Sequence, residues 1–302
     1  MIRLEGRRVC LITGASTGIG LATAKKMLED GCFVILTARE SSLNRFNGLG
    51  FLRDPSTHWI RPLDVTSAVQ RRELIDEISR TLGRLDILIN NAGVLYRTPI
   101  ECASELECNE QMQVNFHAPL EIIKVAMPLM RAQGGGHIIN MSSAAGFFAV
   151  PTMGLYAASK FALEGASEAL QHELRPWKIH LTLVEPGFVS SPADPRLGAE
   201  FNAAERWRGL DDYRLQNSTV NALVEWAVHL TTATPEKVAV AISQVARMRR
   251  PPLRTRVTLD AQVFHFLKCF LPERVFDGLV GVCLRVMSRP AASAAGTSAP
   301  QL

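Results

Sequence analysis

Apolar runs of strand length alternate with longer helix-like segments through most of this 302-residue chain. The strand-length runs lie at 8–13, 33–38, 58–62, 86–90, 136–141, 179–184 and 254–258. The helix-like segments, with apolar residues at three- and four-residue spacing, lie near 19–30, 67–82, 104–131 and 154–175. This α/β alternation predicts a parallel sheet of about seven strands with helices on both faces. Right-handed crossovers make such a sheet doubly wound, with its ligand at the carboxyl ends of the strands.

The first apolar run leads into a glycine-rich turn, and a helix pattern begins directly after it. Glycines permit a tight turn and a close approach to the backbone, and the helix directs its free amide groups and positive dipole end at a phosphate. Glycines also form plain turns, but the strand before and the helix after them favour a phosphate-binding cradle. Its residues are Gly14, Ser16, Thr17, Gly18, Ile19 and Gly20.

Tyr156 and Lys160 stand one helical turn apart and therefore share a helix face. A free tyrosine ionises at about pH 10, and an ammonium held within about 4 to 6 Å lowers that pKa. Such a tyrosine can exchange a proton with an alcohol or a carbonyl near neutral pH. The same spacing would also place a solvated pair on an exposed helix face, which is the alternative interpretation.

The composition excludes several classes of protein. The net charge of +4 is modest and the cations are scattered among the acids, so we expect no nucleic-acid partner. The six cysteines form no Cys-x-x-Cys pattern, which fits a reducing cytosol and indicates no metal site. No secretory signal precedes the first strand, and no stretch of about 18 uncharged apolar residues is present. We therefore expect a cytoplasmic protein without a spanning helix.

The length of the chain suits one α/β domain with additions better than two independent domains. We expect a dinucleotide-binding and catalytic domain at 1–259, a helical extension packed on it at 260–290, and a disordered tail at 291–302. The polar stretch that follows Pro186–Ser191 and continues to about Gln216 has no strand pattern and predicts a lid or a binding loop.

Residues 260–288 have the pattern of two short amphipathic helices. Our first interpretation is that their apolar side chains pack over the substrate end of the domain. The alternative is peripheral attachment to a membrane surface, which nearby cations would assist. These cations are Lys268, Arg274, Arg285 and Arg289.

Further motif residues accompany the glycine turn and the Tyr156 segment. They are Thr13, Asn90, Asn91, Ala92, Gly93, Asn115, Ser143, Pro186 and Gly187. With these residues at these positions, and Ser143 thirteen positions before Tyr156, the chain resembles the short-chain dehydrogenase/reductase family over about residues 5–260. The resemblance implies a single Rossmann fold, a nicotinamide cofactor, and hydride transfer on an alcohol or a ketone.

The resemblance also implies catalytic roles for four residues. Tyr156 would be the general acid when a ketone is reduced and the general base when an alcohol is oxidised. Lys160 would lower the pKa of Tyr156 and bind the nicotinamide ribose. Ser143 would hold the substrate oxygen where negative charge develops, unless it is an ordinary strand-end hydroxyl. Asn115 would bend its helix and hold a water molecule that relays protons.

Other positions would line the cofactor, according to the same resemblance. Asn91, Ala92 and Gly93 would face the adenine ribose, although a simple turn at a strand exit would look similar. Asp64, next to Val65, would meet the adenine amino group; an aspartate that caps the following helix is the alternative. The nicotinamide would lie against Pro186, Gly187, Val189 and Ser191.

The choice of cofactor depends on the end of the second strand. Dehydrogenases that use NAD place an acid there, whereas this chain has Ala38 followed by Arg39, whose guanidinium suits a 2′-phosphate. We therefore expect NADP. The glycine turn lacks the further cation that many NADP-dependent relatives have, so a neutral site that accepts NAD as well stays open.

The substrate is expected to be a hydrophobic secondary alcohol or ketone, because apolar side chains dominate such pockets. The apolar residues near the site are Phe147, Phe148, Val150, Met153 and Leu155. The pattern from Pro251 onward is loosely similar to the branch that holds 17β-hydroxysteroid and retinol dehydrogenases, which implies a steroid-, retinoid- or lipid-like substrate. Family habit implies a homodimer or homotetramer through the helices near 104–131 and 154–175.

Two other functions compete with this hypothesis. A cofactor-binding regulatory or scaffold protein could keep the fold and lose the chemistry, but it would not need the full set of catalytic residues. A nucleotide-sugar epimerase or dehydratase of the related extended group shares the Tyr156 and Lys160 spacing. Those enzymes usually space their glycines as Gly-x-x-Gly-x-x-Gly, and the glycines at 14, 18 and 20 do not fit that pattern.

Overall fold

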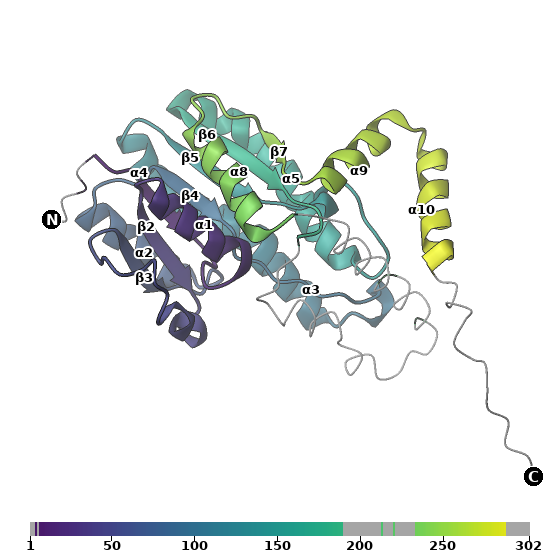
Figure 1. Ribbon diagram of the computed structural model, residues 1–302, viewed down its shortest axis with the longest axis horizontal. Coiled ribbons are helices and arrows are strands. Elements are labelled where there is room, and N and C mark those ends of the chain that lie inside the picture. Colours follow the sequence, from purple (N-terminus) through teal and green to yellow (C-terminus); the bar gives the residue numbers. More distant parts are fainter. Residues whose placement is uncertain (1–3, 5, 190–212, 214–219, 221–232, 288–302) are drawn as a thin grey trace, which may run out of the picture.

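Seven parallel strands form one sheet in the computed structural model, which describes residues 4, 6–189, 213, 220 and 233–287 (Figure 1). The strands are β1 (Val9–Ile12), β2 (Phe33–Ala38), β3 (His58–Pro62), β4 (Ile87–Asn90), β5 (Gly136–Met141), β6 (Ile179–Glu185) and β7 (Arg254–Arg256). Their order in the sheet is β3-β2-β1-β4-β5-β6-β7. The predicted doubly wound Rossmann fold is confirmed, and the order reverses between β1 and β4, where such sheets bind ligands.

Helices cover both faces of the sheet, which explains why most strands are apolar on both sides. On one face lie α1 (Gly18–Glu29) and α8 (Pro235–Arg247), which pack against each other and on alternate strand residues such as Ile12 and Val34. On the other face, α2 (Ala68–Thr81), α4 (Ala118–Ala132) and α5 (Gly154–Leu174) cover Leu11, Ile35 and their neighbours. The core is therefore two apolar layers separated by the sheet.

The predicted helix at 104–131 is wrong as one continuous element. The structure has α3 (Glu105–Met112), a π-helical segment η3 (Gln113–His117) and then α4. Ser104 and Glu107 form a capping box at the start of α3, which fixes where the helix begins. The π-helical segment carries Asn115, whose side chain bonds to Val94 and Ser159 instead of facing solvent.

Helix α8 was not among the predicted helices, although its sequence carries clear signals. Thr234 caps it by accepting a hydrogen bond from the Lys237 N–H at 3.4 Å, and Pro235 occupies the first turn. Val238 and Ile242 lie at helical spacing on its buried face. The remaining short helical turns are η1 (Glu40–Phe46), η2 (Ile100–Cys102), η4 (Ala144–Gly146) and η5 (Arg175–Trp177).

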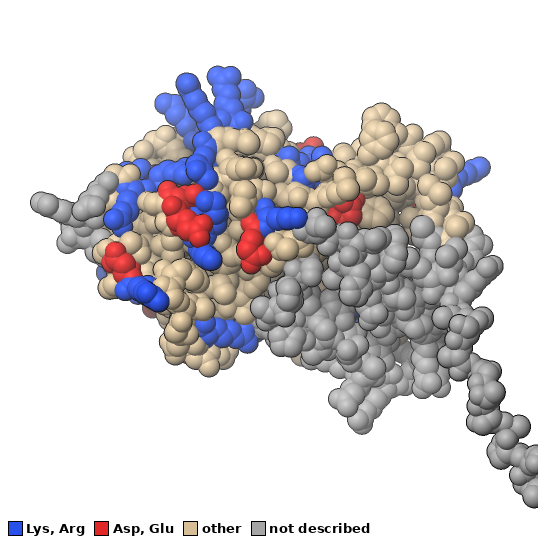
Figure 2. Space-filling model, in the orientation of Figure 1, with Lys and Arg blue, Asp and Glu red and all other residues tan. Residues whose placement is uncertain are grey.

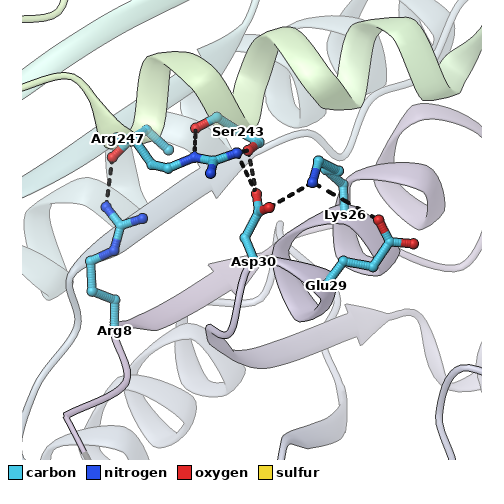
Figure 3. Close-up of polar contacts among 7 residues, drawn as sticks. Arg8, Lys26, Glu29, Asp30, Ser243 and Arg247 are labelled. Carbon is cyan, nitrogen blue, oxygen red and sulfur yellow. Dashed lines mark hydrogen bonds and ion pairs between the residues drawn. The ribbon is translucent and has the colours of Figure 1, made fainter.

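Polar contacts join α8 to α1 (Figure 3). The carboxylate of Asp30, just after α1, accepts from Lys26 Nζ at 2.6 Å and from Arg247 Nη2 at 3.1 Å. It also accepts a hydrogen bond from the Ser243 hydroxyl. Arg8, before β1, donates to the Ala246 carbonyl at 2.7 Å near the end of α8. These contacts hold the two helices together on their face of the sheet.

Two helices continue the chain after β7, as predicted for 260–288. They are α9 (Leu259–Phe270) and α10 (Glu273–Met287), and they extend to one side of the sheet (Figure 1). Within the described parts of the chain, no helix is both long and apolar enough to cross a membrane. Most of the predicted lid up to Gln216 and the predicted tail at 291–302 lie outside the described residues.

Candidate active site

The glycine turn between β1 and α1 has the shape of a phosphate cradle. Gly14 and Gly18 adopt positive φ values of 64° and 54°, which favour glycine. A Cβ atom on Gly20 would lie 2.3 Å from the Gly14 carbonyl oxygen, so only glycine fits there. The positive dipole end of α1 begins directly after this turn, as a phosphate site requires.

The turn after β4 closes against this cradle. The Asn91 amide group donates to the carbonyls of Thr13 at 3.0 Å and Gly14 at 2.9 Å. In return, the Thr13 hydroxyl accepts from the backbone N–H groups of Asn91 and Ala92, both at 3.0 Å. Gly93 follows, beside the Asn115 side chain. The structure therefore brings the predicted adenine-ribose turn and the glycine turn together at the β1–β4 switch point.

The expected adenine-side residues follow the next two strands. Arg39 comes directly after β2 and its side chain is exposed. Asp64 and Val65 come after β3, and the Asp64 carboxylate accepts from the Thr66 N–H at 2.9 Å and the Thr66 hydroxyl at 2.7 Å. The helix cap of α2 is Ser67, so Asp64 does not have the capping role that was its alternative.

Tyr156 and Ser143 meet beyond the end of β5, and Lys160 lies beside them. The Ser143 hydroxyl lies close enough to the Tyr156 phenol to lower the phenol's pKa. The Lys160 Nζ atom lies 5.6 Å from the centre of the Tyr156 ring and donates to the Met141 carbonyl at 2.7 Å. The Ser143 hydroxyl also accepts from the Ala145 N–H at 3.1 Å, which fixes its direction. Three of the four expected catalytic side chains therefore lie together.

Asn115, the fourth, lies behind this group in η3. Its amide donates to the Ser159 hydroxyl at 3.1 Å and to the Val94 carbonyl at 2.9 Å. Ser159 in turn donates to the Tyr156 carbonyl at 2.7 Å. Asn115 is therefore connected to the helix that carries Tyr156 through one hydroxyl group.

The electrostatics differ from the simple expectation that Lys160 acidifies Tyr156. Partial burial raises the pKa of the Tyr156 phenol, and the nearby Ser143 hydroxyl offsets this only in part. Burial also lowers the pKa of Lys160 to about 8, against the effect of the Glu164 carboxylate. The reason is that Lys160 is buried and Tyr156 has restricted access to water, which disfavours the charged form of each group. Tyr156 is thus protonated at neutral pH, the form that can donate a proton.

A group of charged residues behind Lys160 was missed at the sequence level. Glu164 lies one turn further along α5 and accepts from Arg254 Nε at 2.9 Å. Arg254 also contacts Glu168 at 2.7 Å, and Glu185 at 3.5 Å. Burial, with the Glu164 charge, raises the pKa of Glu185 to about 7. The four-residue spacing between Lys160 and Glu164 could have indicated that these two side chains are neighbours. The bond from Arg254 to Glu164 could not be read from the sequence, because the two residues are far apart in the chain.

The turn after β6 carries Pro186, Gly187 and Val189, the expected wall of the nicotinamide, while Ser191 lies outside the described residues. The Pro186 carbonyl accepts from the Ala144 N–H at 2.8 Å. Because Ala144 follows Ser143, this turn and Ser143 belong to one connected region.

Aromatic side chains join the C-terminal helices to the loop that follows Ser143. Phe148 stacks on Phe264 at 5.2 Å between ring centres and meets Phe276 edge-on at 5.4 Å. Phe147 meets His265 edge-on at 5.3 Å. One side of α9 and α10 therefore packs on this loop.

The site fits a dinucleotide by its own geometry. The cradle, in which Gly14 and Gly20 leave no room for a side chain, lies at the first βα turn. Tyr156 follows β5, two strands from β1, at the same carboxyl edge of the sheet. If the phosphates of a dinucleotide bind at the start of α1, one half of the molecule would lie near β2 and β3 and the other half near Tyr156. Cradle and tyrosine together define a class of protein, the Rossmann-fold oxidoreductases.

Comparison with known proteins places the chain within that class. The family model for short chain dehydrogenases matches residues 8–200, and the chain belongs to this family. The 3-ketodihydrosphingosine reductase of Bacteroides thetaiotaomicron is 36% identical over 272 residues, which cover 89% of this chain and 95% of the relative. The uncharacterized oxidoreductase YbbO of Escherichia coli K12 is 32% identical over 272 residues, with 89% and 93% covered.

Solved structures of the family are also similar. A short-chain dehydrogenase from Streptomyces avermitilis is 25% identical and aligns with a TM-score of 0.73 over 93% of this chain and 98% of its own. A metagenomic short-chain oxidoreductase in complex with NADP is 26% identical, with a TM-score of 0.63 over 83% of this chain and 98% of its own.

Proposed function

We propose that this protein is an NADP-dependent oxidoreductase that transfers a hydride between the nicotinamide and a hydrophobic secondary alcohol or ketone. The observation that carries the proposal is the closeness of Tyr156, Ser143 and Lys160 at the edge of the sheet that holds the phosphate cradle. In ketone reduction Tyr156 would act as the acid, and in alcohol oxidation as the base.

Each side chain has a defined task in this proposal. The bound nicotinamide supplies or accepts the hydride. Ser143 holds the substrate oxygen, and Tyr156 donates its phenolic proton to that oxygen as negative charge develops on it. Lys160 then favours the phenolate through its charge and, by family pattern, binds the nicotinamide ribose. Asn115 supports this end of α5 through Ser159 and would hold the water molecule that returns a proton.

NADP is the proposed cofactor, with NAD as the alternative. Arg39 is exposed directly after β2, where a 2′-phosphate would need a cation. The similar metagenomic oxidoreductase was solved with NADP. The adenine side would be lined by Asp64, Val65 and the Asn91–Gly93 turn, and the nicotinamide side by Pro186, Gly187, Val189 and Ser191.

A lipid-like ketone is the proposed substrate. Phe147 and Phe148 follow Ser143, and the C-terminal helices add Phe264 and Phe276 to the same apolar region. The relative from Bacteroides thetaiotaomicron is named for the reduction of a ketone on a long-chain sphingoid base. Steroid and retinoid ketones share the apolar character and belong in the same panel.

Purified protein should oxidise NADPH with at least one long-chain ketone of such a panel, and NADH should be a poorer reductant. Tyr156→Phe removes the proton donor and should lower kcat by about 100-fold or more, while the Kd for NADPH stays unchanged. Full turnover by this variant would contradict the role of Tyr156. Binding of NADPH without turnover of any ketone would instead favour the catalytically silent regulatory or scaffold protein.

The assembly and location of the protein are further proposals. Exposed apolar residues on α3 and α5, such as Leu106 and Phe161, support a homodimer or homotetramer through these helices. A second apolar face on α9 and α10 supports peripheral membrane contact of a cytoplasmic protein. Its members are Val263, Phe266, Phe270, Val275, Leu279 and Val282.

A further inference from the structure

The first turn of α9 bonds directly to the turn after β6. The Gly187 N–H donates to the Thr258 hydroxyl at 2.8 Å, and the Phe188 N–H donates to the Asp260 Oδ2 atom at 2.8 Å. Thr258 and Asp260 lie 71 and 72 positions further along the chain than the residues they bind. Two consecutive backbone amides are therefore held by side chains of the C-terminal extension.

Side chains at these two positions normally cap the start of their own helix, but Thr258 and Asp260 bond to the turn after β6 instead. Thr258 is the N-cap residue, yet its hydroxyl makes no capping bond to α9. Asp260, in the first turn, also directs one oxygen away from its own helix toward Phe188. The capping interactions of α9 have been exchanged for contacts with the turn.

Gly187 is explained by the same contact. A Cβ atom at this position would lie 2.0 Å from an Asp260 oxygen and 2.4 Å from the Asp260 Cγ atom. Its φ value is not in the left-handed region, so backbone conformation does not require glycine here. Glycine is needed because any side chain would push Asp260 away from the Phe188 N–H.

Helix α9 also touches the other segment beside the reacting groups. Lys268 donates a hydrogen bond to the Phe147 carbonyl, and the His265 ring packs against the Phe147 ring. Phe147 follows Ser143 by one short turn, η4. The extension therefore contacts both the loop that carries Ser143 and the turn opposite it.

We propose that Thr258 and Asp260 are positioning residues that fix the 186–188 turn in the shape that receives the nicotinamide half of the cofactor. The inference rests on the proposed nicotinamide cofactor and extends it to residues outside the family motifs. If the two side chains are removed, the turn loses both bonds and must be ordered when the cofactor binds. The adenine half, which binds at the cradle and after β2, should be unaffected.

The test measures the binding of two probes to the full-length protein by calorimetry. NADPH has both halves of the cofactor, whereas adenosine 2′,5′-bisphosphate has only the adenine half. Thr258→Val and Asp260→Ala should each raise the Kd for NADPH by about 3- to 10-fold, the effect of one hydrogen bond, and leave the Kd for the bisphosphate unchanged. Thr258→Ser keeps the hydroxyl and should bind both probes as the wild-type protein does.

Gln262→Ala is the matched control, because Gln262 lies in the same part of α9 but bonds to Arg256 instead of the turn. It should leave both Kd values unchanged. Equal weakening of both probes in Thr258→Val and Asp260→Ala, or no weakening of NADPH, would overturn the proposal. This test uses no ketone, so its result does not depend on turnover. If the protein binds NADPH but reduces no ketone, the proposed function is contradicted, whereas the proposal for Thr258 and Asp260 is not.

Discussion

Lys160 is a buried cation whose charge depends on a neighbouring carboxylate. Burial lowers its pKa to about 8, while Glu164, one turn along α5, raises it. The Lys160 amine donates to the Met141 carbonyl, so its place is fixed whichever charge it carries. Glu164 is itself held by Arg254 from β7. Whether Lys160 is charged at neutral pH is therefore decided partly by Glu164.

Glu164→Gln should make the reductase reaction more sensitive to alkaline pH. The loss of a negative charge lowers the pKa of Lys160 further, so the lysine loses its proton at lower pH. In the wild-type protein we expect kcat/KM for ketone reduction to fall as the pH rises through about 8, the pKa of Lys160. In the variant this fall should move by about one unit toward lower pH. The pH profile of kcat/KM measures the effect.

Glu168→Gln provides the control for this prediction. Glu168 also contacts Arg254, at 2.7 Å, but its side chain is exposed and two turns from Lys160. Its removal should leave the pH profile in place. A profile that moves equally in both variants would show that Arg254, and not the Glu164 charge, controls Lys160.

At the scale of elements, α8 is attached to α1 through one carboxylate (Figure 3). Burial alone would raise the pKa of Asp30, but hydrogen bonds from Lys26 and Ser243, with the charge of Arg247, hold it below the usual value. A carboxyl group with a lowered pKa stabilises the fold above its unfolded pKa, and this contribution is lost as the pH falls through the folded pKa. Asp30 therefore stabilises the α1–α8 pair at neutral pH.

Asp30→Asn should lower the free energy of unfolding at pH 7 by about 1–3 kcal/mol, because charged hydrogen bonds are lost. The difference from the wild-type protein should begin to shrink below about pH 4, where Asp30 of the unfolded chain becomes protonated, and should disappear as the pH falls through the lower folded pKa. Urea unfolding at pH 7 and at pH 3.5 checks both statements. Glu29→Gln is the control, because Glu29 is half exposed and its contact with Lys26 is long, at 3.9 Å. This variant should change the free energy of unfolding little.

At the scale of the whole molecule, α9 and α10 have two different sides. One side packs on Phe148 and bonds to the turn after β6, whereas the other exposes apolar side chains such as Phe266, 58% exposed, and Phe270, 72% exposed. In Figure 2 the surface over these helices carries few charged side chains. The extension therefore contacts the segments beside the candidate site on one side and exposes apolar side chains on the other.

The proposed membrane contact predicts binding to lipid vesicles. Vesicles of phosphatidylcholine with phosphatidylglycerol should carry the protein upward in a flotation gradient, and the double variant Phe266→Ser, Phe270→Ser should reduce that fraction several-fold. Val69→Ser, which changes an exposed apolar residue on α2, should have no effect. Equal flotation of all three proteins would contradict a role for α9 in membrane contact.

Local patterns were sufficient to predict the strands and much of the candidate site. Gly14, Gly18 and Gly20 form a single turn, and Tyr156 and Lys160 share one turn of helix, so their relative positions follow from spacing alone. The family resemblance implied a bend at Asn115, but periodicity did not show that the bend is a π-helical segment, because such a segment leaves no periodic signal distinct from that of the helices around it. Helix α8 carries signals of the same local kind, a Thr234 cap and apolar residues at helical spacing, so it could have been predicted from the sequence as well.

The sequence by itself determined the parallel α/β fold, the phosphate cradle and the tyrosine–lysine turn, because each depends on residues a few positions apart. Only the tertiary structure decided that Asp260 bonds to Phe188, that Arg254 holds Glu164, and that burial raises the pKa of Tyr156. These contacts join residues far apart in the chain, or depend on the exclusion of water by other elements. No periodicity or spacing encodes either effect, since both arise when separate elements pack together.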